Sequence, residues 1–308
     1  MKIGFLTGCL NLSLEEIVVF ASSAGFQALE LSAWPVVNTR DYSGSTIDVA
    51  TMDSKKAEEI NQLFRKHGLT ISSLAYYDNN LHHDLEVREG YLQHLRQVID
   101  AASLLGVELV GTFVGRDQTK TIAANMDEFE KVFMPLLSYA ESKNVKIMIE
   151  NCPMPGWNAD GWGGTISYSP EQWREMFKRV PNKNFGLNFD PSHLYWLGID
   201  YIKAVSDFKD RIFHVHAKDT IIFKDKFYEY GIFGKQLNRK SEWDVGWWAY
   251  RMPGRGEINW AKFINALKEI GYDGVISIEH EDLEYEGTVE KVKEGLKLGY
   301  KFLSERLG

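Results

Sequence analysis

The chain has 308 residues, 44% of them apolar and 25% charged, which is the composition of a globular protein with a large buried core. Its formal charge of −8 makes the average surface repel phosphodiester backbones and anionic membranes, so neither nucleic acid nor a membrane is expected as a partner. Two cysteines, no secretory leader pattern and no apolar run of bilayer length predict a protein of the reducing cytoplasm.

Short apolar runs alternate with amphipathic stretches along the whole sequence. The runs with strand character cover residues 2–8, 26–33, 69–77, 107–114, 145–151, 185–190, 212–219 and 274–280. The stretches with helical periodicity cover residues 13–25, 53–68, 88–106, 126–144, 169–180, 201–211, 259–271 and 288–308. Helix-start signals support several of them, such as a capping box from Ser13 to Glu16 and Pro170 at the first helical position after Ser169.

This alternation implies a parallel sheet with right-handed crossovers, and eight such units predict one (β/α)₈ TIM-barrel domain over residues 1–308. The alternative is an open doubly wound sheet, which usually carries a glycine-rich phosphate loop after a strand. The sequence has no GxGxxG after its first strand and no GxxxxGKS or GxxxxGKT anywhere, which favours the barrel.

Each of the last four predicted strands ends in a carboxylate or an imidazole, namely Glu150, Asp190, His216 and Glu279. Apolar residues occupy the alternate positions of these strands, as Ile149 does beside Glu150, and would face the helices. The carboxyl ends of barrel strands form a single mouth, where the chemistry of this fold takes place. The four polar side chains are therefore expected to converge there.

Three carboxylates and an imidazole in one apolar-walled mouth would repel one another unless a cation lay among them. One divalent metal ion is therefore expected. Oxygen and nitrogen ligands without thiolate suit Mn²⁺, the expected ion, and equally admit Mg²⁺, Co²⁺ or Zn²⁺. The alternative is that the four groups form separate structural ion pairs or are solvated at the rim.

The motifs IMIEN, FDPSH, HVHAKD and SIEHED, in this order on the last four strands, resemble the xylose isomerase-like superfamily of sugar isomerases and epimerases, in particular the ketose 3-epimerases. The resemblance covers essentially the whole chain. It implies that the four strand-end residues bind one divalent metal and that Glu150 and Glu279 also move the proton. It further implies that His193 contacts a substrate oxygen. The chain departs from the 3-epimerases at residues 220–222, where Thr-Ile-Ile replaces their arginine, so substrate identity does not carry over.

These observations predict a metal-dependent isomerase or epimerase acting on a sugar, keto-sugar or sugar phosphate, by proton abstraction next to a carbonyl through a metal-bound enediolate. A dehydratase or β-eliminating lyase on a keto-sugar or keto-glycoside would use the same first step. An endonuclease IV-like repair enzyme is a remote alternative, because the extra histidines of that family are missing from the fourth strand and from the segment after His216. A sugar-binding barrel without catalysis is a further alternative.

Lys218 lies two residues after His216 and therefore points in the same inward direction. Its ammonium group could bind a substrate hydroxyl, carboxylate or phosphate, or could pair with Asp219 or Asp190 as a structural bridge. His214 and Glu30 have the same inward pattern and are expected to orient polar groups deeper in the barrel, without a catalytic role.

Residues 220–257 form an unusually long connection with nine aromatic side chains. Such a segment is expected to be a lid over the site, a surface that stacks on sugar rings, or a subunit contact in a homo-oligomer. Trp157 and Trp162, in the loop after the fifth strand, are further candidates for sugar contact. Arg255 is either an anion contact for the substrate or a clasp for the loop.

Overall fold

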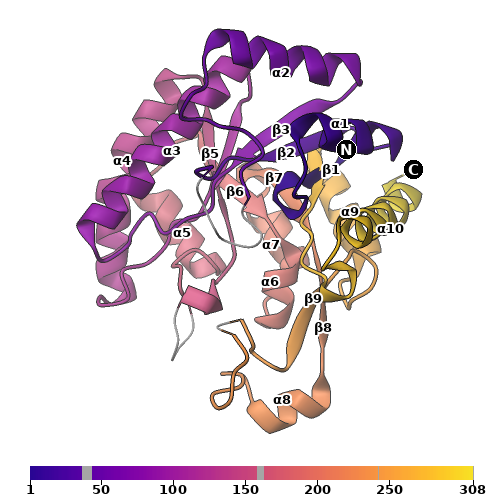
Figure 1. The fold of residues 1–308 in the computed structure, drawn as a ribbon. Coiled ribbons are helices and arrows are strands. Elements are labelled where there is room, and N and C mark those ends of the chain that lie inside the picture. Colours follow the sequence, from indigo (N-terminus) through magenta and orange to yellow (C-terminus); the bar gives the residue numbers. More distant parts are fainter. Residues whose placement is uncertain (37–43, 158–162, 242, 308) are drawn as a thin grey trace.

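The structure is a computed structural model that describes residues 1–36, 44–157, 163–241 and 243–307. Parallel strands close a barrel in the circular order β1, β2, β3, β4, β5, β6, β7 and β10, and helices surround it (Figure 1). The barrel strands are β1 Lys2–Leu6, β2 Ala28–Ser32, β3 Thr70–Ala75, β4 Leu109–Thr112, β5 Lys146–Glu150, β6 Phe185–Phe189, β7 Ile212–Ala217 and β10 Val275–Ile278. The predicted barrel is confirmed.

The helices follow the strands in turn. They are α1 Leu14–Ser23, α2 Ser54–Lys66, α3 Leu85–Leu105, α4 Ile122–Ser142, α5 Pro170–Arg179, α6 Pro191–Trp196, α7 Tyr201–Asp207, α9 Trp260–Glu269 and α10 Val289–Leu307. Among the helices of the described ranges, none combines the length and the apolar character needed to cross a bilayer.

Local capping fixes several helix starts. The capping box of α1 forms as expected between Ser13 and Glu16, and α5 begins at Pro170 behind a second box at Ser169. The predicted starts of α3 and α4 were wrong by three and four residues. These helices begin earlier because the side chains of Asp84 and Thr121 accept hydrogen bonds from the backbone of the first turn.

The segment 220–257 is more ordered than a loop. Antiparallel strands β8 Asp219–Ile222 and β9 Trp248–Arg251 form its stem, and α8 Lys224–Tyr230 lies beyond them, away from the barrel (Figure 1). A small core of Trp196, Val245, Trp247 and Trp248 joins the stem to α6. The sequence predicted a long aromatic-rich connection here but not its two strands and helix, and part of its aromatic content packs internally.

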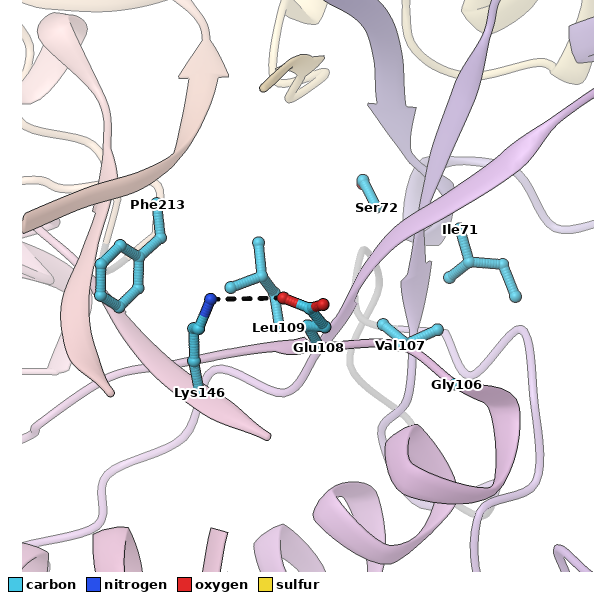
Figure 2. A pocket seen from close by; sticks show the side chains of 8 residues that line it. All are labelled: Ile71, Ser72, Gly106, Val107, Glu108, Leu109, Lys146 and Phe213. Atoms are coloured by element: carbon cyan, nitrogen blue, oxygen red, sulfur yellow. Dashed lines mark hydrogen bonds and ion pairs between the residues drawn. The ribbon is translucent and has the colours of Figure 1, made fainter. Parts of the chain in front are cut away.

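A hollow at the amino-terminal end of the barrel lies between the starts of β3, β4 and β5 (Figure 2). Its polar side chains are already paired: Lys146 Nζ lies 3.3 Å from Glu108 Oε2, and Ser72 Oγ lies 3.2 Å from the inner His214 Nε2. This end of a barrel serves stability rather than chemistry. The strand-end residues singled out in the sequence lie at the opposite end.

Candidate metal centre and cavity

The four strand-end residues meet at the carboxyl end of the barrel. One ligand atom from each of Glu150, Asp190, His216 and Glu279 lies within 4.8 Å of the others. Glu150 ends β5, Asp190 follows β6, His216 lies in β7 and Glu279 follows β10. The first three are fully buried, and the Glu279 side chain is 14% exposed, so the group opens in one direction only.

Hydrogen bonds fix the position of Asp190 but involve only one of its two carboxylate oxygens. Its Oδ1 accepts a hydrogen bond from Ser192 N at 2.7 Å, as the N-cap of α6. Its backbone is fixed by Asn151, whose side-chain Oδ1 accepts from Asp190 N and whose Nδ2 donates to Asp190 O, both at 2.8 Å. The buried Oδ2 accepts no hydrogen bond from any described residue.

Neighbouring groups of opposite charge shift the pKa values of residues in the cluster. Burial alone would raise the pKa of Glu150, but hydrogen bonds from His193 and His216 outweigh it and hold this pKa well below its usual range. Burial alone would lower the pKa of His216, but the carboxylates of Glu30 and Glu279 raise it well above its usual value. The protein groups thus provide more negative than positive charge at this point.

These observations test whether a divalent cation suits the site. The donors are three carboxylates and one imidazole with no thiolate among them, which is a set used by hard and borderline divalent ions. Asp190 Oδ2 accepts no hydrogen bond from the described residues, and the Lys218 ammonium 3.4 Å away is shared with Glu279 and Glu281, so a divalent cation would add the compensation that a buried carboxylate needs. The residues present therefore fit the expected ion.

His193 is part of the cluster. It lies on α6, fully buried, with Nε2 at 3.2 Å from Asp190 Oδ2 and 3.4 Å from Glu150 Oε1. Its Nδ1 lies 2.8 Å from the hydroxyl of Tyr250, which belongs to β9 of the inserted segment. The sequence pattern left α6 undetected, although the Asp-Pro-Ser run is a helix-start signal that could have revealed it.

Lys218 is buried among three carboxylates. Its Nζ lies 2.5 Å from Glu279 Oε2, 2.8 Å from Glu281 Oε2 and 3.4 Å from Asp190 Oδ2, and 4.3 Å from the centre of the Tyr250 ring. Burial alone would lower the pKa of Lys218, and these carboxylates raise it well above its usual value. Of the bridges considered from the sequence, the one to Asp190 forms. Sequence reasoning missed Glu281, which repeats the direction of Glu279 two residues later.

Asp219 points away from the cluster and anchors the inserted segment. Its Oδ1 accepts from the backbone N–H of Thr220 and of Ile258, both at 2.9 Å. Its Oδ2 accepts from Gly254 N at 2.9 Å and from the indole Nε1 of Trp260 at 2.8 Å. The expected alternative of a Lys218–Asp219 bridge is therefore wrong, because both carboxylate oxygens serve the base of the insertion.

A cavity of about 510 Å³, counting the part open to solvent, extends from the cluster. Its charged lining residues are Glu150, Lys218, Glu279 and Glu281. Its aromatic walls are Trp34, Tyr77, Phe113, Trp243 and Tyr250. Two of these rings, Trp243 and Tyr250, come from the inserted segment, so this segment closes one side of the cavity.

Trp34 follows β2 and was not singled out in the sequence. Its side chain is 95% buried, and its Nε1 finds no hydrogen-bond partner among the described residues. A buried indole N–H normally has an acceptor. Because Trp34 lines the cavity, its unpaired N–H is suited to an oxygen atom of a bound molecule.

Two predicted contacts lie outside the cavity lining. Trp157 packs edge-on against Phe113, with ring centres 5.5 Å apart, and so supports the wall from behind. Arg255 is one-third exposed, pairs with Asp282 and Glu284, and is not brought to the cluster. Of the two expected roles of Arg255, the geometry favours the loop clasp. Trp162 lies outside the described residues.

Comparison with known proteins agrees with this fold. A family model described as xylose isomerase-like TIM barrel matches residues 18–304. An uncharacterised protein, YfiH of Bacillus subtilis (strain 168), is 27% identical over 306 residues, covering 92% of this chain and 93% of that protein. Further similar proteins are named inosose isomerase and inosose dehydratase.

Solved structures show the same architecture. The IOLI protein with a bound zinc atom has a TM-score of 0.72 at 20% identity, covering 100% of this chain and 98% of that one. D-psicose 3-epimerase of Clostridium cellulolyticum H10, solved with D-tagatose, has a TM-score of 0.71 at 17% identity, covering 100% and 99%. At such identities these likenesses establish the fold. Because the family model spans nearly the whole chain, the chain belongs to the family of xylose isomerase-like TIM barrels.

Proposed function

We propose that this protein is a divalent-metal-dependent isomerase or epimerase of a sugar or keto-sugar. The observation that carries the proposal is the meeting of four ligand atoms within 4.8 Å where the cavity begins. Two of the four residues, Glu150 and Glu279, also line the cavity. Names of similar proteins, such as inosose isomerase and D-psicose 3-epimerase, point to the same class of reaction.

Glu150, Asp190, His216 and Glu279 would hold the ion. When bound, it would polarise the substrate carbonyl and stabilise the negative charge that develops on proton abstraction; manganese is the expected ion, and magnesium, cobalt or zinc would suit the same donors. The zinc atom in the IOLI structure supports a metal in this fold.

The chain itself would move the proton. Glu150 and Glu279 approach the cavity from β5 and from the end of β10, so one carboxylate can take a proton from a carbon atom and the other can return it on another face or carbon. His193 and Lys218 lie beside them as hydrogen-bond donors to substrate oxygens. The aromatic walls, with Trp243 and Tyr250 from the insertion, would pack on the sugar ring and exclude water.

A dehydratase or lyase on a keto-sugar is the second candidate. It would begin with the same proton abstraction and would then lose a group from the neighbouring carbon atom. The similar proteins named inosose dehydratase favour keeping it. Uptake of solvent deuterium with an intact carbon skeleton would indicate epimerisation or isomerisation, whereas release of water or of an aglycone would indicate elimination.

The test combines elemental analysis with assays on ketoses and 3-keto-glycosides in deuterated water. We expect one divalent ion per chain, and a loss of deuterium exchange of at least about 10² to 10⁴-fold in Glu150→Gln and in Glu279→Gln. Glu108→Gln, at the far end of the barrel, is the matched control and should retain activity. A metal-free protein whose sugar affinity is unchanged by Glu150→Gln would instead be a binding barrel.

A further inference from the structure

Beneath the metal cluster lies a fully buried layer of polar side chains, centred on Glu30 of β2. Its Oε1 accepts a hydrogen bond from the hydroxyl of Tyr77 at 2.8 Å. Its Oε2 accepts from the hydroxyl of Ser277 at 2.8 Å and lies 2.9 Å from Nε2 of His216. Glu30 thus reaches across the barrel interior and contacts a cluster residue from the side opposite the cavity.

The two ring nitrogens of His216 face different surroundings. Nδ1 points to the cluster, at 3.0 Å from Glu150 Oε1 and 3.2 Å from Glu279 Oε2. Nε2 points down to Glu30. Carboxylates only accept hydrogen bonds and face both nitrogens, so once an ion occupied Nδ1 the remaining proton of the imidazole would lie on Nε2, directed at Glu30.

Asn188 contacts Tyr77 and both histidines of this layer. Its Nδ2 lies 2.7 Å from the Tyr77 hydroxyl, which accepts that hydrogen bond and donates its own proton to Glu30. Its Oδ1 accepts from Nδ1 of His214 at 3.0 Å. The Asn188 amide nitrogen, which only donates, also lies 2.9 Å from His216 Nε2, so the proton on Nε2 depends on the charge-assisted contact to the Glu30 carboxylate being the stronger of the two.

A second ion is the competing interpretation, because single ligand atoms of Glu30, His214 and His216 also lie within 4.8 Å of one another. The Glu30 oxygens already accept hydrogen bonds from the hydroxyls of Tyr77 and Ser277, and His214 Nδ1 already donates to Asn188 Oδ1. Asp190 Oδ2 in the upper cluster accepts none from the described residues. The lower group is therefore closed by hydrogen bonding, whereas Asp190 Oδ2 has only the contacts to Lys218 and His193, which makes the upper group the better place for an ion.

We infer that Glu30 is a positioning residue for His216: it fixes the tautomer and the ring direction that present Nδ1 to the metal. The inference rests on the proposed metal site and extends it to a strand that contributes no ligand. Carboxylates behind a ligating histidine increase its basicity, and their removal typically weakens metal binding about 10 to 100-fold.

The test is Glu30→Gln, which keeps the shape and removes the charge. Metal affinity is measured by chelator competition with Mn²⁺ and Co²⁺ on protein stripped of metal, and the visible absorption of the Co²⁺ form reports the ligand set. We expect one ion per chain in wild type and variant, a 10 to 100-fold weaker affinity in Glu30→Gln and an altered Co²⁺ spectrum. Ser277→Ala, which removes a neutral partner of Glu30 but leaves the carboxylate, is the matched control and should bind near wild-type affinity.

The outcomes separate the two proposals. If the wild-type protein binds no divalent ion, the proposed function fails. If it binds one ion and Glu30→Gln binds with the same affinity and spectrum, the role of Glu30 is refuted while the metal site stands. Two ions per chain would also overturn the inference, because Glu30 would then be a ligand. Should Glu30→Gln fail to fold, Glu30→Asp withdraws the carboxylate from Nε2, and an unchanged affinity there would refute the role equally.

Discussion

Replacing Asp219 by asparagine should destabilise the protein without removing the metal site. Each carboxylate oxygen of Asp219 accepts two hydrogen bonds, one pair from Thr220 N and Ile258 N and the other from Gly254 N and Trp260 Nε1. Whichever way an asparagine amide turns, its NH₂ group meets two of these donors. Two buried donors without an acceptor cost about 1–3 kcal/mol each, so we expect the free energy of unfolding to fall by about 2–6 kcal/mol.

Urea denaturation of metal-free Asp219→Asn and wild type measures this difference, with Asp210→Asn on the exposed surface as the control. Metal stoichiometry should remain one per chain, because Asp219 points away from the cluster. The KM of Asp219→Asn should rise, because Asp219 holds the base of the insertion that carries Trp243 and Tyr250. A loss below about 1 kcal/mol, the size of one ordinary hydrogen bond, would refute the reasoning.

Three further predictions concern the cluster and the insertion. Stripping the metal should lower the melting temperature. Restoring the ion at about 100 times its dissociation constant should increase the free energy of unfolding by about 2.7 kcal/mol, as measured by calorimetry. An unchanged melting temperature would argue against an ion at the buried carboxylates. Lys218→Met should cost the metal-free protein about 3–5 kcal/mol in urea denaturation, because the buried carboxylates of Asp190 and Glu279 lose their ammonium partner. An undiminished stability would contradict the ion-pair geometry. Gly156→Ala would bring a Cβ to 2.5 Å from the Trp243 ring. It should raise KM in steady-state assays and leave the metal affinity, measured by chelator competition, unchanged. Equal KM values in variant and wild type would show that this ring does not shape the substrate site.

The barrel could be predicted from the sequence because each of its strands is a short apolar run followed by a helix with its own start signal. The starts of α3 and α4 could not, because periodicity becomes visible only where apolar residues recur, whereas the caps Asp84 and Thr121 lie upstream of that point. The stem of β8 and β9 escaped detection for another reason. Its strands are four residues long and pair across some thirty residues, which leaves little local pattern to read.

The part of the candidate site that lies on the barrel strands was predictable, because alternation along a strand gives the direction of each side chain. Alternation along four strands was enough to bring Glu150, Asp190, His216 and Glu279 together in one group. Alternation does not say which of several acids a buried lysine will meet, so the Lys218–Glu281 contact was missed. Nor does it reveal an unpaired donor such as Trp34 Nε1, since satisfaction of a buried polar atom depends on the whole surrounding structure.

The stem of the insertion has a consequence for how substrate range could change in this fold. Asp219 pairs with Arg251 and Ile222 with Trp248, so the chain returns beside its point of departure. Residues between Ile222 and Trp248 can therefore be exchanged for a segment of another length while β7 and α9 keep their places. Under the proposed function, the side chains that contact the substrate could then change, in evolution or by engineering, separately from the four strands that supply Glu150, Asp190, His216 and Glu279.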